Sequence, residues 1–204
     1  MNLIDRAKNI LITPQKEWDV IKGEQPNTSA IITGYVLPLA GAAAVAAFIG
    51  YAFIGVNWGF GIRLKGMDWG LYQGLSVLLG ALLSVFVCAL IIDALAPSFG
   101  SEKNMGRSVQ LVAYSFTPGW VGGLLAIVPA LALIGSLAGL YGLYLLYIGL
   151  PKLKNTPQDK QGSYFVVPLI TIIVVFILVG FIIGKILISI FGIEYPTAGV
   201  NIRL

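Results

Sequence analysis

Asp93 is the acidic residue that lies inside an apolar segment, FVCALIIDALAP. A carboxylate at the centre of a bilayer costs about 2.5–3.5 kcal/mol, and such residues usually carry a function. Pro97 follows four residues later, about 6 Å along a helix, so the carboxylate can reach the membrane interface. It can also pair with a basic residue nearby: Lys103, Arg107 or Lys152. Two roles remain open, an anchoring or structural carboxylate and a proton or cation site.

Lys185 is the basic counterpart in the last apolar segment. It lies about 20 residues, or about 30 Å of helix, from the start of that segment, so it should lie near the opposite face of the membrane from Asp93. We expect the side chain to extend to the interface with its ammonium in water. A pair with Asp68, at the same face, is the alternative.

Hydroxyl side chains gather around Pro118, which is followed directly by Gly119. Proline removes a backbone hydrogen bond, so the sequence predicts a kink or a short unwound turn in the middle of a membrane helix. Lipid cannot satisfy the carbonyl that is freed there. Hydroxyl groups can do so by hydrogen bonding, or can line a polar path. The candidates are Tyr114, Thr117, Tyr141 and Tyr144.

Most enzyme and metal chemistry lacks its residues here. The chain has no His, which removes imidazole bases, Ser-His-Asp triads and the commonest metal ligand. Cys88 is the single cysteine and lies in an apolar segment, where it packs as a small hydrophobe. No phosphate-binding G-x-x-x-x-G-K-[ST] motif occurs. We therefore expect no enzyme activity, no catalytic residues, no cofactor and no metal site.

The composition indicates a membrane protein. The chain of 204 residues is 57% hydrophobic and 11% charged, whereas soluble domains average about 25% charged residues. No charged residue occurs from 108 to 151. Because about 20 apolar residues cross a bilayer, this stretch predicts two crossings joined by a tight turn near Pro129.

The hydropathy pattern predicts an all-α polytopic transmembrane bundle with five spans. An amphipathic helix over residues 2–12 should lie at the interface. A second helix should begin at Thr13-Pro14 and place Trp18 at headgroup level. Three regions follow: a segment 1–30 on the cytoplasmic side, the membrane domain 31–192, and an extracytoplasmic tail 193–204. The predicted spans are 31–56, 71–96, 107–128, 130–150 and 165–191, with Pro38 interrupting the first early.

Lys and Arg are distributed unequally between the two predicted sides. One side holds nine of the 13 basic residues and the other holds Arg63, Lys65, Lys185 and Arg203. The positive-inside rule then places the N-terminus in the cytoplasm and the C-terminus outside. The first side includes Lys152, Lys154 and Lys160, which can contact anionic lipid headgroups or act only as a topology signal.

Small residues recur four positions apart in the apolar segments. Such pairs let helix backbones approach closely, either within one bundle or between copies in a homo-oligomer. The pairs are Gly70/Gly74, Gly80/Ser84, Gly119/Gly123, Gly135/Gly139 and Gly180/Gly184. We expect the lipid bilayer to be the main partner, and no nucleic acid.

Several segments together resemble the Yip family of Ypt/Rab-interacting membrane proteins, in its prokaryotic branch. The resemblance implies five spans with a cytoplasmic N-terminus. Eukaryotic members bind prenylated Rab GTPases, but the Asp-Leu-Tyr-Gly-Pro-like segment typical of them is absent before residue 31. The matching segments are RAKNILITPQKEWDVI, TGYVLPLAG, AYSFTPGW and YGLYLLYIGLPKLKNTP, followed by DK and Tyr164.

These observations favour a non-enzymatic protein of the inner (cytoplasmic) membrane that acts as a scaffold, organises lipid or binds other proteins. The alternative is a small transporter or channel with a site near the break at Pro118, because broken helices mark transport sites.

Overall fold

The computed structural model describes residues 2–57 and 63–191, and these are almost entirely helical. The predicted tail 193–204 lies outside the described residues. Two short helices come first, α1 (Leu3–Ile12) and α2 (Pro14–Gly23). Asn2 caps α1 by accepting a hydrogen bond from the backbone of Asp5. Pro14 opens α2, as expected from its fixed φ, although the Thr13 side chain makes no capping bond.

The first long helix is continuous from Thr28 to Ile54 and contains two π-helical turns. Its parts are α3 (Thr28–Ile31), η1 (Ile32–Val36), α4 (Leu37–Ile49) and η2 (Gly50–Ile54). In η1 the amide of Leu37 donates to Ile32, one residue further back than in an α-helix. The interruption therefore lies at Pro38, as the sequence predicted, but takes the form of a π-turn that precedes it.

A short β-hairpin, which the sequence did not predict, follows the first long helix. It pairs β1 (Val56–Asn57) with β2 (Arg63–Leu64) in antiparallel register. Next come α5 (Met67–Leu95) and the 3₁₀ turn η3 (Ala96–Phe99). With only two residues in each strand, the hairpin serves as the turn between two long helices.

The predicted third span is divided into separate helices. These are α6 (Met105–Ser115), α7 (Thr117–Gly123) and the 3₁₀ turn η4 (Leu124–Ile127). A further 3₁₀ turn, η5 (Pro129–Leu131), follows at the tight turn predicted near Pro129. The chain continues through α8 (Ala132–Lys154) and α9 (Gln161–Phe191). Helix α8 ends later than predicted, with Pro151 accommodated inside it, and α9 begins earlier than predicted.

Three helices of the described chain are long and apolar enough to cross a membrane: Thr28–Ile54, Met67–Phe99 and Pro129–Lys154. Shorter apolar stretches occur within α9, at Gln161–Val174 and Gly180–Phe191. The chain is thus a helical membrane protein, and exposed Leu, Ile, Val and Phe side chains cover these helices.

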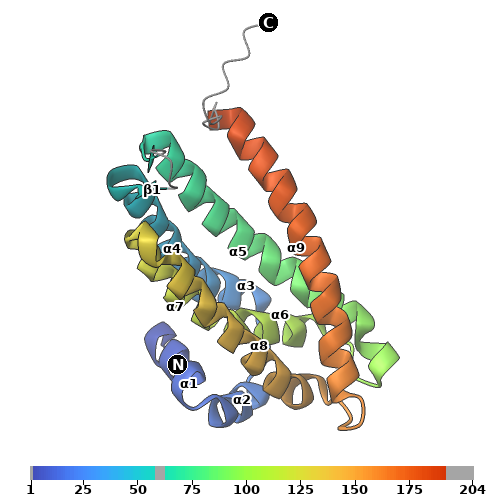
Figure 1. Cartoon of the computed structure of the whole chain (residues 1–204). Helices are drawn as coiled ribbons and strands as arrows, with labels where there is room; N and C mark the ends of the chain where they lie inside the picture. The colour runs from blue at the N-terminus through green and yellow to red at the C-terminus, as the bar shows by residue number, and fades with distance from the viewer. Residues whose placement is uncertain (1, 58–62, 192–204) are drawn as a thin grey trace, which may run out of the picture.

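The long helices run side by side, with α4 between α5 and α7, and α8 against α7, while α9 follows α5 (Figure 1). Helices α1, α2 and α6 gather at one end of this bundle, where α8 also ends and α9 begins (Figure 1). We call this end the N-terminal end. The β-hairpin lies at the other end.

Small residues bring several of these helices into close contact. A Cβ on Gly70 would lie 2.6 Å from Ala52, and one on Gly74 would lie 3.0 Å from the Ala44 carbonyl. Gly135 similarly approaches the backbone of Gly122. These glycines are therefore used for packing inside the bundle.

Candidate functional site

Two turns of α6 are buried on every side. All residues from Ser108 to Ser115 are buried, with α3, α5 and α8 packed around them. Three of these residues are polar, Ser108, Gln110 and Ser115, and Tyr114 adds a hydroxyl. Because buried polar groups need partners, α6 organises the polar contacts at the N-terminal end of the bundle.

Asp93 forms a buried ion pair with Lys154, its carboxylate oxygen 2.8 Å from the ammonium. Lys154 is fully buried and also donates to the Ser108 hydroxyl at 2.8 Å and to the Asn104 carbonyl at 3.2 Å. An ammonium has three donors, so all are satisfied. Asp93 additionally accepts from the Asn104 amide at 2.7 Å and from Ser108 at 3.1 Å.

This pair corrects two of our expectations. Asp93 does not pair with any of the residues predicted for it, Lys103, Arg107 or Lys152. The partner is Lys154, which was predicted to contact headgroups and instead is shielded inside the protein. The reason is the length of α8, which continues to Lys154 rather than ending near residue 150 and so carries the ammonium to the end of α5.

Arg6 is buried beneath α1 and binds two carboxylates. Its guanidinium lies 2.6 Å from Glu17, and both side chains are almost completely shielded. A second nitrogen pairs with Glu24, and the group stands over the Tyr114 ring, 5.2 Å from its centroid. The face that docks is formed by Arg6, Ala7 and Ile10, and Ile4 turns outward.

Trp18 fixes α2 to the bundle. Its side chain is fully buried, in contrast to the headgroup position that we predicted. A Cβ on Gly149 would lie 2.8 Å from the indole and 2.6 Å from Leu111. The glycine in α8 therefore leaves the space that the ring fills. Trp18 also makes an edge contact with Tyr114.

Basic and hydroxyl groups of the bundle satisfy the ends of the N-terminal helices. Arg107 donates to the Ile21 and Lys22 carbonyls at 3.0 and 2.9 Å, which completes the last turn of α2. The Tyr141 hydroxyl does the same for α1 by donating to Leu11 at 3.0 Å. These contacts hold α1 and α2 as fixed parts of the protein.

The break before Pro118 is closed by hydrogen bonds. Proline has no amide hydrogen, so the Tyr114 carbonyl loses its helical donor. The Thr117 hydroxyl donates to that carbonyl at 2.8 Å, and the Tyr35 hydroxyl lies 2.7 Å from Thr117. Thr117 has used its single proton, so Tyr35 must be the donor to it. We expected hydroxyls to satisfy the freed carbonyl, and Thr117 does so directly.

The remaining predicted site residues lie apart from this cluster. Tyr144 stacks on Tyr141 and is 44% exposed. Lys152 pairs with Asp19 of α2, and Lys160 is exposed. The Lys185 ammonium lies 5.5 Å from the Phe181 ring centroid, and no ion pair joins it to Asp68.

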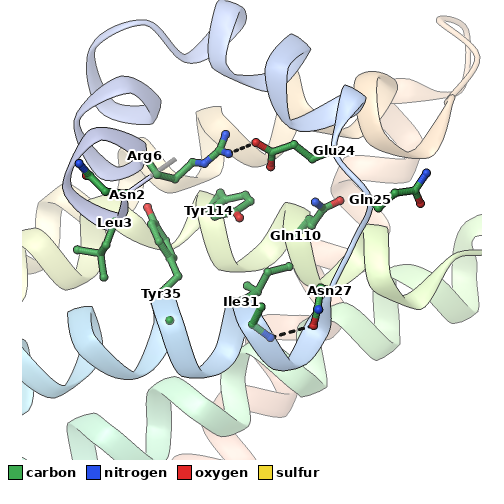
Figure 2. A pocket seen from close by; sticks show the side chains of 12 residues that line it. Asn2, Leu3, Arg6, Glu24, Gln25, Asn27, Ile31, Tyr35, Gln110 and Tyr114 are labelled. Atoms are coloured by element: carbon green, nitrogen blue, oxygen red, sulfur yellow. Dashed lines mark hydrogen bonds and ion pairs between the residues drawn. The ribbon is translucent and has the colours of Figure 1, made fainter.

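A pocket of about 380 Å³ opens between α1, the start of the first long helix, and α6. Arg6 and Glu24 lie on one side, Asn27 and Ile31 lie opposite, and Tyr114 and Gln110 lie between (Figure 2). Sequence reasoning missed Arg6, Glu17 and Glu24 as site residues, since these three side chains meet only through the packing of α2 on α1. Over residues 2–57 and 63–191 no group of acidic, His or Cys side chains could hold a metal.

Comparison with known proteins also identifies a membrane protein. A family model described as the Yip1 domain matches residues 8–181. The chain is 33% identical over 156 residues to inner membrane protein YohC of Escherichia coli K12, covering 74% of this chain and 80% of the relative. The protein of the same name from Escherichia coli O6:H1 gives equal values. No solved structure gives a significant match.

Proposed function

The chain belongs to the Yip1 domain family, and from that premise we propose that it is a non-enzymatic membrane scaffold whose N-terminal helices organise one leaflet of the bilayer. The observation that carries this proposal is an outward stripe on α1. Ile4, Lys8 and Ile12 occupy positions four apart and so share a face. Ile4 is 72% and Ile12 is 67% exposed, and Lys8 is exposed between them.

Helix α2 exposes a similar pair. Lys16 and Val20 are also four residues apart, and both are exposed, Val20 to 50%. We call Ile4, Lys8, Ile12, Lys16 and Val20 the interfacial stripe. Large apolar side chains alternating with lysines suit the boundary between headgroups and acyl chains, where apolar groups are buried and lysines meet anionic headgroups.

The docking of α1 and α2 gives the interfacial stripe a fixed orientation. Ile10, Trp18 and Ile21 are fully buried against the bundle, and Arg6 is tied to Glu17 and Glu24. A surface that is already ordered loses little conformational entropy when lipid binds. A docked helix pair therefore supports lipid organisation better than a mobile tail would.

We place five crossings in this scaffold, with α6–α7 and α9 adding to the three long helices. The segment 1–30 then lies in the cytoplasm, and residues 31–192 form the membrane domain of an inner-membrane protein. The excess of Lys and Arg at the N-terminal end supports this orientation. Of the glycines in the predicted small-residue pairs, Gly80, Gly139 and Gly180 have open space around them and remain for contact between copies.

The transport alternative has less support. The backbone carbonyl that is freed at the break accepts a hydrogen bond from Thr117, and Gly142 of α8 packs against the Ser115 carbonyl. The two grooves beside α7 are lined largely by apolar residues such as Phe116, Trp120 and Leu125. A transported polar solute needs donors and acceptors along its path, and the described residues there offer few.

Lipid recruitment in proteoliposomes tests the proposal. The protein carries a donor dye on the loop near Gln158, and a trace of acceptor-labelled phosphatidylglycerol is added to a zwitterionic bilayer. We expect energy transfer above the value for random mixing. The double variant Lys8→Gln/Lys16→Gln should lose several-fold of that enrichment, since each lysine contributes about 1 kcal/mol.

Lys65→Gln is the matched control, because it removes an exposed charge at the other end of the bundle. It should leave the enrichment near Gln158 unchanged. Energy transfer at the value for random mixing in both the native protein and the double variant would contradict the proposed scaffold function.

A further inference from the structure

The pocket beneath α1 contains three carboxamides whose oxygen atoms are already bound. Asn2 accepts from the Asp5 amide at 2.8 Å, and Asn27 accepts from the Ala30 amide at 3.0 Å. The oxygen of Gln110 accepts from Arg107 at 2.9 Å. Backbone amides and guanidinium groups only donate, so these contacts fix which end of each carboxamide is the oxygen.

The NH₂ groups of these three residues are therefore the ends that these contacts leave without a bond. Among the described residues, none of them has a hydrogen-bond partner. Gln110 is 1% exposed, and Tyr114 is 6% exposed with a hydroxyl that bonds to no described residue. All four side chains line the same pocket. Asn2 and Asn27 are exposed, whereas the Gln110 NH₂ group and the Tyr114 hydroxyl belong to buried side chains. A donor on a buried side chain that lacks an acceptor is costly, so this part of the pocket suits a group rich in acceptors.

The charges around the pocket are balanced. Arg6 pairs with Glu17 and Glu24, and Arg107 donates to the Gln110 oxygen, so two basic and two acidic side chains lie beside the pocket. Arg6 supplies further N–H donors to the lining. Neutral surroundings with several donors suit a group that has many acceptor oxygens and a single negative charge. A phosphodiester is such a group.

The position of the pocket indicates that the phosphodiester belongs to a lipid headgroup. Ala30, Ile31, Gly34 and Tyr35 line it from the first two turns of the first long helix. At 1.5 Å per residue these turns reach about 10 Å from the helix start, which matches the depth of the headgroup region. Leu3 and Ile31 add apolar surface beside the donors.

We propose that this pocket binds the phosphate group of a membrane phospholipid, held by the Asn2, Asn27 and Gln110 amides, the Tyr114 hydroxyl and Arg6. Glu24 limits the affinity, because its carboxylate lines the pocket and occupies Arg6. The proposal concerns a single site behind α1. It does not depend on the interfacial stripe, which lies on the outer face of α1 and α2.

The test is a titration of delipidated full-length protein in detergent, followed by native mass spectrometry. The probe is a short-chain phosphatidylglycerol, with a short-chain diacylglycerol and inorganic phosphate as separate arms. We expect one saturable phospholipid per chain, no binding of diacylglycerol, and weaker binding of inorganic phosphate. Equal affinity for inorganic phosphate would overturn the lipid assignment, and absence of saturable phospholipid binding would overturn the site.

Variants that keep the local fold sharpen the test. Asn27→Ser retains a helix cap but removes the NH₂ group, and Gln110→Glu retains the oxygen that accepts from Arg107. Each should weaken phospholipid binding about tenfold, as expected for losing a charge-assisted hydrogen bond. Asn104→Ser makes the same exchange at the cap of α6, outside the pocket, and should bind like the native protein.

Glu24→Gln distinguishes recognition from damage. It removes one of the two carboxylates that pair with Arg6, and the pair with Glu17 remains. Phospholipid should therefore bind several-fold more tightly, whereas a structural defect would weaken it. Unchanged or weaker binding in Glu24→Gln, or native binding in both Asn27→Ser and Gln110→Glu, would overturn the proposal. Lys8→Gln/Lys16→Gln should leave this titration unaltered, which separates the pocket from the scaffold function.

Discussion

The Lys154 ammonium lies 2.8 Å from the Asp93 carboxylate and joins the end of α8 to the end of α5. Both side chains are shielded, to 0% and 8% exposure. Ser108 and Asn104 of the α6 region bind both partners. Three helices therefore meet through one ion pair, which makes it a structural clamp at the N-terminal end of the bundle.

Breaking this clamp should destabilise the protein strongly. Lys154→Met leaves the Asp93 carboxylate buried without its partner, which costs about 3–5 kcal/mol. The double variant Asp93→Leu/Lys154→Met removes both charges and should recover much of that loss. Thermal unfolding in detergent measures both, with the exposed Lys160→Met as control. A loss below about 1 kcal/mol in the single variant would argue against the clamp.

Gly149→Ala should release α2 from the bundle. The new methyl group would lie 2.8 Å from the Trp18 indole and 2.6 Å from Leu111. Such overpacking costs about 1–3 kcal/mol, and the indole can move only by undocking. Hydrogen exchange of residues 3–23 should accelerate. Gly139→Ala in the same helix meets open space and serves as the control; equal exchange in both variants would contradict the packing argument.

Thr117→Val should lower the stability of the folded protein at the break in the membrane helix. The hydroxyl bonds the Tyr114 carbonyl that Pro118 leaves free, and it also contacts Tyr35. Its loss leaves a buried carbonyl unsatisfied, at about 1–3 kcal/mol. Thr117→Ser keeps the hydroxyl and should lose less. Comparable unfolding temperatures for the valine variant and the native protein would show that the hydroxyl is dispensable.

The sequence predicted the membrane class, the order of the helices and the break at Pro118. These follow from long uncharged stretches and from the missing amide of proline, both of which are local properties. Thr117 bonds the carbonyl that Pro118 frees, as expected of a hydroxyl there, whereas the Tyr141 hydroxyl bonds to Leu11 of α1. The five-span count stays a prediction, since three helices among the described residues meet the length and hydropathy needed for a crossing.

The polar contacts at the N-terminal end could not be predicted, because they depend on tertiary packing. Arg6 meets Glu17 and Glu24 only after α2 folds back along α1. Lys154 reaches Asp93 because α8 is one turn longer than its hydropathy indicated. Trp18 is buried because Gly149 leaves room for it. Spacing along the chain carries no signal for any of these pairs.

The central claim is that the interfacial stripe of the docked helices lies in the lipid headgroup boundary, and the depth of a spin label tests it most directly. Ile12 is replaced by a labelled cysteine in a Cys88→Ala background, with the exposed Asp19 labelled as a control. The label at 12 should collide with oxygen dissolved in the bilayer more than with a water-soluble nickel complex, and the label at 19 should show the reverse. A label at 12 that collides mainly with the nickel complex would contradict the account.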